Sequence, residues 1–260
     1  MSRPRTYKTE AIVLRQMPLG EADRIFTLFT LDSGKVRAVG KGVRRTRSRL
    51  GGHVELLNRV SISLGRGRDL DVVSEAQALQ TYPLLRTDLE RLSKAIYLAE
   101  LVDVFSAERS SSYQVYELLT DTLDILEETP SPDLLLRHFE MRLLDVSGYR
   151  PELHHCIECR SELQPGDHSF SCAAGGVRCP LCRGSSGEPL ISISISSMKV
   201  LRLLQREVTP SRVLGINLPP RVTDETEKTL RTYIRFIVER DLKSAEFMNL
   251  VTRDGTQPDR

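Results

Sequence analysis

Hydrophobic and polar residues alternate over short runs in the first eighty residues, which is the pattern of half-buried β-strands. In the run 59–64, for example, Val60, Ile62 and Leu64 alternate with arginine and serine. Turn-forming glycine, aspartate and serine residues separate the runs. The pattern predicts five strands, over residues 9–17, 24–30, 35–40, 54–64 and 70–78. Five short strands in about eighty residues favour a small closed barrel, of which the OB-fold is the commonest five-stranded form.

From residue 84 onward the apolar positions recur with the period of an α-helix. They predict helices over residues 89–105, 113–128 and 135–148, then one capped by Ser196 or Ser197, and a final clear helix from Asp224 to Leu242. Each helix carries an apolar stripe, as expected for the core of a helical bundle. Polar residues after Thr252 predict a disordered tail.

One segment, residues 34–52, combines a strand pattern with an unusual charge. It holds seven cations and no acidic residue. Those of its first half lie at alternate positions, so a strand would present them on one face. Glycines and dense like charge predict a flexible loop for the second half. A cationic strand that leads into a cationic loop suits the backbone of a polyanion; a solvated surface loop or a localisation-type basic run is the alternative. The seven residues are Lys35, Arg37, Lys41, Arg44, Arg45, Arg47 and Arg49.

The charge of the chain is divided unevenly along its length. Residues 1–80 carry 15 Lys and Arg against 8 Asp and Glu, whereas the remainder carries 22 against 27. A basic N-terminal region on an acidic body predicts that this region meets an anion. There is no basic-then-apolar leader and no run of about 18 apolar residues. We therefore expect a cytoplasmic protein without a membrane partner.

All five cysteines lie within one short segment, residues 156–182. Two CxxC pairs, separated by 19 residues, have the spacing of a four-thiolate zinc site. The predicted ligands are Cys156, Cys159, Cys179 and Cys182. A closed four-sulfur site leaves no open coordination position, so the Zn²⁺ is expected to be structural. Four nearby residues could compete for a position: Cys172, His154, His155 and His168.

The motifs of several enzyme classes are absent. A zinc deaminase needs H-x-E and a proline before the second CxxC, where this chain has Arg178. A P-loop needs Ser or Thr after its lysine, and here Gly42 follows Lys41. No G-x-S-x-G elbow occurs. We therefore predict a protein that is not an enzyme and has no catalytic residue.

These observations predict an α+β chain of several domains. We expect an OB-fold DNA-binding domain over residues 1–80 and a zinc-binding module over 151–190. A helical domain would be formed in two parts, 81–150 and 191–250, with a disordered tail over 251–260.

Several short motifs resemble one known family. The most distinctive is AVGKGVRR at residues 38–45, followed by Ser48-Arg49. Shorter matches are Tyr7-Lys8, AIVL at 11–14, GEAD at 20–23, Phe29-Thr30, Gly34-Lys35, CIEC, Gly175-Gly176, CPLC and Lys243-Ser244. Together with the order of the domains, they resemble the family of the bacterial recombination mediator RecO.

The resemblance implies a role in DNA repair within the RecFOR pathway, in the bacterial cytoplasm and associated with the nucleoid. It implies binding of single- and double-stranded DNA and annealing of complementary strands. It also implies loading of RecA, together with RecR, on strands coated by single-strand-binding protein. The acidic C-terminal tail of that protein would bind the helical body, with Arg137, Arg142 and Arg202 as candidates for a basic rim.

The residues set one limit on how DNA is held. OB-folds that bind single strands usually stack bases on aromatic side chains, but residues 1–80 offer only Tyr7, Phe26 and Phe29. The two phenylalanines lie at opposite parity in one strand, so at least one belongs to the core. We therefore expect backbone electrostatics to dominate. The alternative function is a zinc-stabilised enzyme that acts on RNA or nucleotides.

Overall fold

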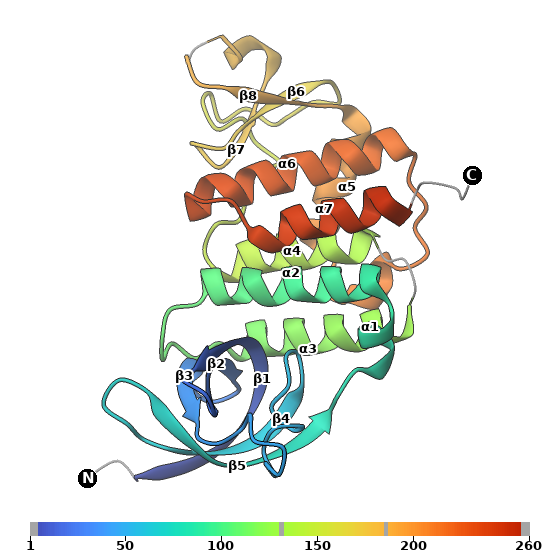
Figure 1. Cartoon of the computed structure of the whole chain (residues 1–260). Coiled ribbons are helices and arrows are strands. Elements are labelled where there is room, and N and C mark those ends of the chain that lie inside the picture. The colour runs from blue at the N-terminus through green and yellow to red at the C-terminus, as the bar shows by residue number, and fades with distance from the viewer. Residues whose placement is uncertain (1–4, 130–132, 185–186, 256–260) are drawn as a thin grey trace. The chain divides into compact units, whose positions relative to one another are not determined.

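The structure is a computed structural model that describes residues 5–129, 133–184 and 187–255 (Figure 1). Residues 1–130 with 243–260 form one compact unit, and residues 131–242 form a second. The predicted helical domain, 81–150 with 191–250, contributes helices to both units. None of the helices described is long and apolar enough to cross a membrane.

The first unit begins with a closed five-stranded barrel, as predicted. Its strands are β1 (Thr6–Leu19), β2 (Asp23–Thr30), β3 (Gly34–Gly40), β4 (Arg59–Gly65) and β5 (Asp71–Gln80). Their order around the barrel is β1-β2-β3-β5-β4, with β3 and β5 parallel and every other pair antiparallel. The fourth strand was predicted from residue 54 but begins at Arg59, because turns that include Leu57 at φ 68° precede it.

The barrel has a hydrophobic core of its own. Alternate residues of the strands point inward, among them Val36 and Ala38 of β3 and Val60, Ile62 and Leu64 of β4. Two residues of the segment between β3 and β4 complete it: Val43 and Val54 are both buried in the same cluster. The core therefore fixes this connecting segment to the barrel at two points.

Four helices accompany the barrel in the first unit: α1 (Pro83–Thr87), α2 (Leu89–Phe105), α3 (Tyr113–Glu128) and α7 (Lys243–Gly255). Asp88 caps α2 by accepting the backbone N–H groups of Glu90 and Arg91. Packing of α2 against α3, α7, β1 and β2 buries most of its circumference. α7 was not predicted; it continues to Gly255, so residues 251–255 of the predicted disordered tail are helical. The rest of that tail, 256–260, lies outside the described residues.

The second unit contains α4 (Asp133–Val146), α5 (Ile195–Arg206) and α6 (Pro220–Val238), which pack against one another. It also contains a three-stranded sheet in the order β7-β6-β8, formed by β6 (His168–Ser171), β7 (Gly176–Arg178) and β8 (Leu190–Ile193). The N-cap of α5 is Ser194, earlier than predicted, and α6 starts at Pro220 rather than Asp224. A proline at the first helical position explains this early start, because its missing N–H costs nothing there.

Candidate nucleic-acid interface and cysteine cluster

The basic loop, residues 41–49, is built of successive turns rather than extended chain. Gly42 donates its N–H to Asp23 Oδ1 at 2.7 Å, and Arg44 donates its N–H to the Ala22 carbonyl at 2.9 Å. Val43 lies inside the barrel, in contact distance of Gly40, where a Cβ would fall 2.7 Å from the Val43 side chain. A glycine at position 40 is therefore required for Val43 to enter the core. The buried Val43 side chain thus fixes the start of a loop that we predicted to be flexible.

Five of the predicted cations project from this loop and are exposed: Lys41, Arg44, Arg45, Arg47 and Arg49. Within the described part of the chain, none of the five forms an ion pair with a carboxylate. The guanidinium of Arg44 donates to the Gly20 carbonyl at 3.0 Å. Lys41 follows the last residue of β3, so it lies beyond the strand face on which the sequence placed it. The loop is a dense group of uncompensated positive charge.

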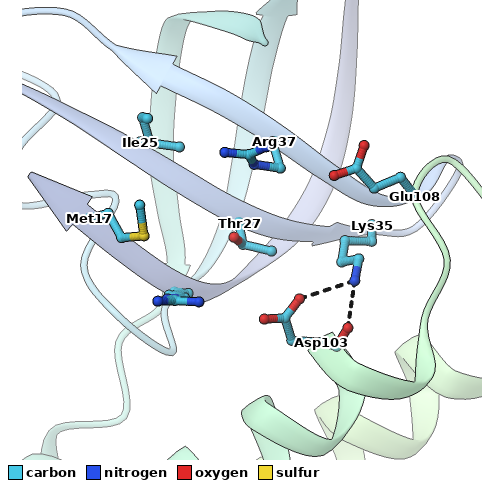
Figure 2. A pocket seen from close by; sticks show the side chains of 8 residues that line it. Met17, Ile25, Thr27, Lys35, Arg37, Asp103 and Glu108 are labelled. Atoms are coloured by element: carbon cyan, nitrogen blue, oxygen red, sulfur yellow. Dashed lines mark hydrogen bonds and ion pairs between the residues drawn. The ribbon is translucent and has the colours of Figure 1, made fainter. Parts of the chain in front are cut away.

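Lys35 differs from the other predicted cations because its ammonium group is already engaged. Its Nζ lies 3.1 Å from Asp103 Oδ1 and 2.5 Å from the Asp103 carbonyl oxygen, at the end of α2, and its side chain is 15% exposed (Figure 2). Its own carbonyl accepts the N–H of Arg109 at 2.8 Å. The preceding Gly34 has φ +64°, and an added Cβ would overlap the carbonyl of Ser110. Lys35 therefore joins the barrel to the segment after α2.

Asp71 of β5, which is fully buried, makes a second contact between the barrel and the segment after α2. Its carboxylate accepts the Tyr7 hydroxyl at 2.6 Å, Arg109 Nη2 at 2.9 Å and the Gly67 N–H at 3.1 Å. Burial alone would raise the pKa of Asp71, but these hydrogen bonds and the charge of Arg109 hold it below its usual value. Burial and the neighbouring Asp71 raise the pKa of Tyr7 to about 12.

The barrel leaves little aromatic surface for base stacking. Phe26 and Phe29 are both fully buried, where the sequence required only one of them to be. Phe26 belongs to the barrel core, and Phe29 pairs with Ile12 on the outer surface, at the strands against which α2 packs. The Tyr7 ring carries the Arg66 guanidinium 4.6 Å from its centroid. Aromatic stacking is thus a small part of what this barrel can offer a nucleic acid.

The outward face of β1, β2 and β3 carries a pocket of about 200 Å³ beside the end of α2 (Figure 2). Cross-strand pairing arranges its lining in rows. Arg15, Thr27 and Arg37 form one row, and Met17 and Ile25 lie in the next. Lys35, Asp103 and Glu108 complete the lining. Across the described residues, the side chains of Arg15, Arg37 and Glu108 make no hydrogen bond or ion pair.

Arg15 was missed by the sequence reasoning, and a β-bulge explains why. Strict alternation from Val13 would put Arg15 inside the barrel. The pairing shifts between Val13 and Arg15, leaving Leu14 as the extra residue, so Arg15 pairs with Thr27 on the outer face. Bulges commonly re-aim a side chain near a functional surface. The sequence did contain a signal of the bulge, because strict alternation places an arginine, Arg15, at a position that should hold a core residue.

The four cysteines predicted as ligands come together in the second unit. The Sγ atoms of Cys156, Cys159, Cys179 and Cys182 all lie within 4.8 Å of one another. The chain between the first pair turns sharply: Arg160, at φ 61°, donates its N–H to the Cys156 carbonyl at 2.9 Å. The Cys179 N–H points at Cys156 Sγ at 3.4 Å, and Cys182 N–H bonds to the Cys179 carbonyl at 3.0 Å. Four converging sulfurs are the donor set that a tetrahedral metal ion requires.

The hydrogen bonds of the cluster shift the pKa values of three of its thiols, and not all in the same direction. The hydroxyl and backbone N–H of Ser161 lower the pKa of Cys159 to about 6. Burial raises the pKa of Cys156, but the N–H groups of Cys179, Cys159 and Glu158 outweigh it and hold the pKa below its ordinary value. Hydrogen bonding to Cys179 and Cys159 raises the pKa of Cys182 to about 12. Backbone N–H groups directed at sulfur stabilise the negative charge of a thiolate, which is the form of cysteine that binds a metal ion.

The competing residues lie apart from this cluster. Cys172 follows β6, and burial raises its pKa. His168 is buried and its Nε2 lies 2.8 Å from the Gln164 carbonyl, while His154 and His155 are exposed. None of these four belongs to the group of converging ligand atoms found among the described residues.

The three arginines proposed as a rim for an acidic peptide are all engaged. Arg137 is buried and its Nη2 lies 2.9 Å from Glu140 Oε1, so the expectation that it contributes to a surface rim is wrong. Arg142 pairs with Asp145 at 2.7 Å. Arg202 donates its Nε to the Leu153 carbonyl at 2.9 Å. The apolar stripe predicted for this helix suggested that its charged residues face outward, so the buried position of Arg137 could not be predicted from the sequence.

Comparison with known proteins assigns both parts of the chain to one family. Residues 1–82 match the family model "Recombination protein O N terminal", and residues 86–246 match "Recombination protein O C terminal". The chain is 36% identical to DNA repair protein RecO of Dehalococcoides mccartyi (strain ATCC BAA-2266 / KCTC 15142 / 195), over 97% of this chain and 99% of that protein. It is 40% identical to DNA repair protein RecO of Roseiflexus sp. (strain RS-1), over 95% and 86% of the two chains. With its OB-like barrel, its helices and its four-cysteine cluster, the chain belongs to the RecO family of DNA repair proteins.

Proposed function

We propose that this protein binds single- and double-stranded DNA through the barrel and the basic loop, with contacts made to phosphates rather than to base edges. The observation that carries the proposal is the group of exposed cations, Arg37, Lys41, Arg44, Arg45, Arg47 and Arg49, without carboxylate partners among the described residues. Uncompensated cations release condensed counterions when they meet phosphates, and this release drives binding. Lys35 is left out of the group because Asp103 already neutralises it.

The family supports a wider role as a recombination mediator. In this proposal the protein anneals complementary strands, because positive charge that screens one backbone can screen a second one brought beside it. It acts with RecR to load RecA on strands coated by single-strand-binding protein. The acidic tail of single-strand-binding protein binds one of the helical surfaces, through apolar contacts and cations other than Arg137. Its action is binding and positioning of strands, without catalysis.

The cysteine cluster holds a structural Zn²⁺ in this proposal. The ion would be bound by Cys156, Cys159, Cys179 and Cys182, whose Sγ atoms already converge. It would fasten the two CxxC turns of the module together, and its four positions would be filled by sulfur, which leaves none for a substrate.

The proposal is tested by the double variant Arg44→Ala, Arg45→Ala of the full chain. Both side chains are exposed, and their removal leaves Val43 in the core. Binding to a mixed-sequence strand and to homopolymer strands is measured over a series of salt concentrations. We expect similar weakening on every strand, and a plot of log K against log salt that is shallower by about 1.4, since each phosphate contact on a single strand contributes about 0.7.

Arg212→Ala, an exposed arginine of the second unit, serves as the matched control and should leave affinity unchanged. An unchanged affinity and slope in the double variant would remove the basic loop from the DNA-binding surface. A loss confined to one homopolymer would indicate base recognition instead.

A further inference from the structure

The pocket on the outer face of the barrel has a composition that backbone binding alone does not explain. Arg15 and Arg37, which form no ion pair among the described residues, lie opposite Thr27 on the two neighbouring strands. Beside Thr27 and Arg37 lies an apolar surface formed by Met17 and Ile25 (Figure 2). Met17 is 38% exposed although it lies on a strand. Cations next to an apolar surface match a nucleotide, which has an anionic phosphate at one end and a flat, weakly polar base at the other.

We propose that this pocket receives one nucleotide of a single DNA strand with its base turned out of the stack. The inference rests on the proposed DNA binding and specifies what one part of that surface takes. The phosphate lies between Arg15 and Arg37, where Thr27 can donate its hydroxyl. The base packs on Met17 and Ile25. The pocket therefore favours single strands over duplex.

The geometry of the arginine row fits a phosphate. Arg15 and Arg37 are each one strand away from Thr27, so their Cα atoms are about 10 Å apart and their side chains can converge over the middle strand. Arginine donates paired N–H groups that match phosphate oxygens. Lys35 and Asp103 neutralise each other, so Glu108 is the one lining carboxylate without compensation. The row of Arg15, Thr27 and Arg37 lies between Lys35 and the apolar pair of Met17 and Ile25. A phosphate therefore belongs at this row, where two guanidinium groups outweigh the single charge of Glu108.

The volume of the pocket and its apolar lining fit a single base of any type. The pocket, at about 200 Å³, is smaller than the roughly 300–1,000 Å³ of sites for drug-sized ligands, so it suits a single base. Phe26 and Phe29 are buried, so Met17 takes the role that an aromatic residue has in other OB-folds. A thioether is flexible and polarisable, and it packs against the face or edge of any base. Removing a base from a duplex costs a few kcal/mol of pairing and stacking, which disfavours duplex here.

The test measures binding of the full chain to three probes of equal length: an intact single strand, an abasic single strand and a duplex. Met17→Ala should weaken binding to the intact strand about fivefold, the value expected from loss of one buried apolar contact. It should leave the abasic strand and the duplex unchanged. Arg15→Gln should weaken both single strands by a similar factor of about five, as expected for one charge-assisted contact, and leave the duplex unchanged.

Leu79→Ala and Arg68→Gln, at exposed barrel positions outside the pocket, are the matched controls and should have no effect. Unchanged binding of Met17→Ala to the intact strand, or an equal loss on the abasic strand or the duplex, would overturn the inference. If Arg44→Ala, Arg45→Ala still lowers affinity in that case, the proposed DNA binding stands and only the pocket assignment fails. If the wild-type chain binds none of the probes, both fail.

Discussion

The barrel and the cysteine module, residues 151–190, obtain their structure in different ways. The barrel buries alternate side chains of five strands in one continuous apolar core. The cysteine module has strands of three to four residues and few buried apolar side chains, among them Leu153, Leu163, Phe170 and Val177. A core of that size does not offset the entropy of ordering the segment. With the Zn²⁺ proposed above, we expect burial to stabilise the barrel and metal coordination to stabilise the cysteine module, so each region should respond to a different perturbation.

Loss of the metal should produce the largest effect, and only in the cysteine module. Cys179→Ser removes one of four converging sulfurs, and for small sites metal binding supplies about 10–16 kcal/mol of folding free energy. We expect loss of bound Zn²⁺ and of hydrogen-exchange protection over residues 152–182, with protection of β1–β5 unchanged. Metal analysis and hydrogen exchange on the same sample measure both.

Cys172→Ser is the control for this prediction, because Cys172 lies outside the cluster. It should retain about one Zn²⁺ per chain. Zinc kept by Cys179→Ser and lost by Cys172→Ser would mean that the ligand set is wrong.

The sequence predicted the features that depend on local pattern. Strand alternation identified the barrel, and CxxC spacing identified the cysteines that converge. The features it missed depend on contacts between distant residues. The partner of Lys35 is Asp103, 68 residues away, and no local pattern indicates that pairing. A one-residue bulge moved Arg15 to the outer face, where alternation could not place it.

A second prediction separates two cations of β3 that are two residues apart. Lys35→Gln should lower the free energy of unfolding of the first unit by about 1–2 kcal/mol, because it leaves Asp103 partly buried and unpaired. The salt dependence of DNA binding should stay as in the wild type. Arg37→Gln should do the reverse, with unchanged stability and a slope shallower by about 0.7.

Denaturant unfolding and DNA titration on both variants measure these effects. The roles of the two residues would be wrong if Lys35→Gln altered the salt slope while stability stayed constant.

Acid should have a smaller effect, which is a loss of barrel stability caused by protonation of Asp71. Its pKa is lowered in the folded chain, so its contribution to stability is present above the unfolded value of about 3.9 and is lost as pH falls through the folded pKa. Asp71→Asn should therefore destabilise the first unit at pH 7, and its difference from the wild type should shrink progressively as pH is lowered below about 3.9. A difference that stays constant over this acid range would show that the carboxylate charge is not the stabilising feature.

The smallest effect is expected at Glu108, the uncompensated carboxylate of the barrel pocket. Glu108→Gln should raise affinity for single strands about two- to threefold at low salt, because it removes one repulsion at an exposed surface, and the gain should vanish at high salt. Glu75→Gln, at an exposed position of β5, is the control. Equal gains from the two variants would assign the effect to net charge rather than to the pocket.

The central claim is that the exposed cations of β3 and the basic loop hold DNA by its phosphates. The most direct test is the salt dependence of single-strand binding by the wild-type chain, measured on a mixed-sequence strand. Six phosphate contacts predict that log K falls with log salt at a slope of about −4. A slope near zero, with affinity retained at high salt, would contradict the claim.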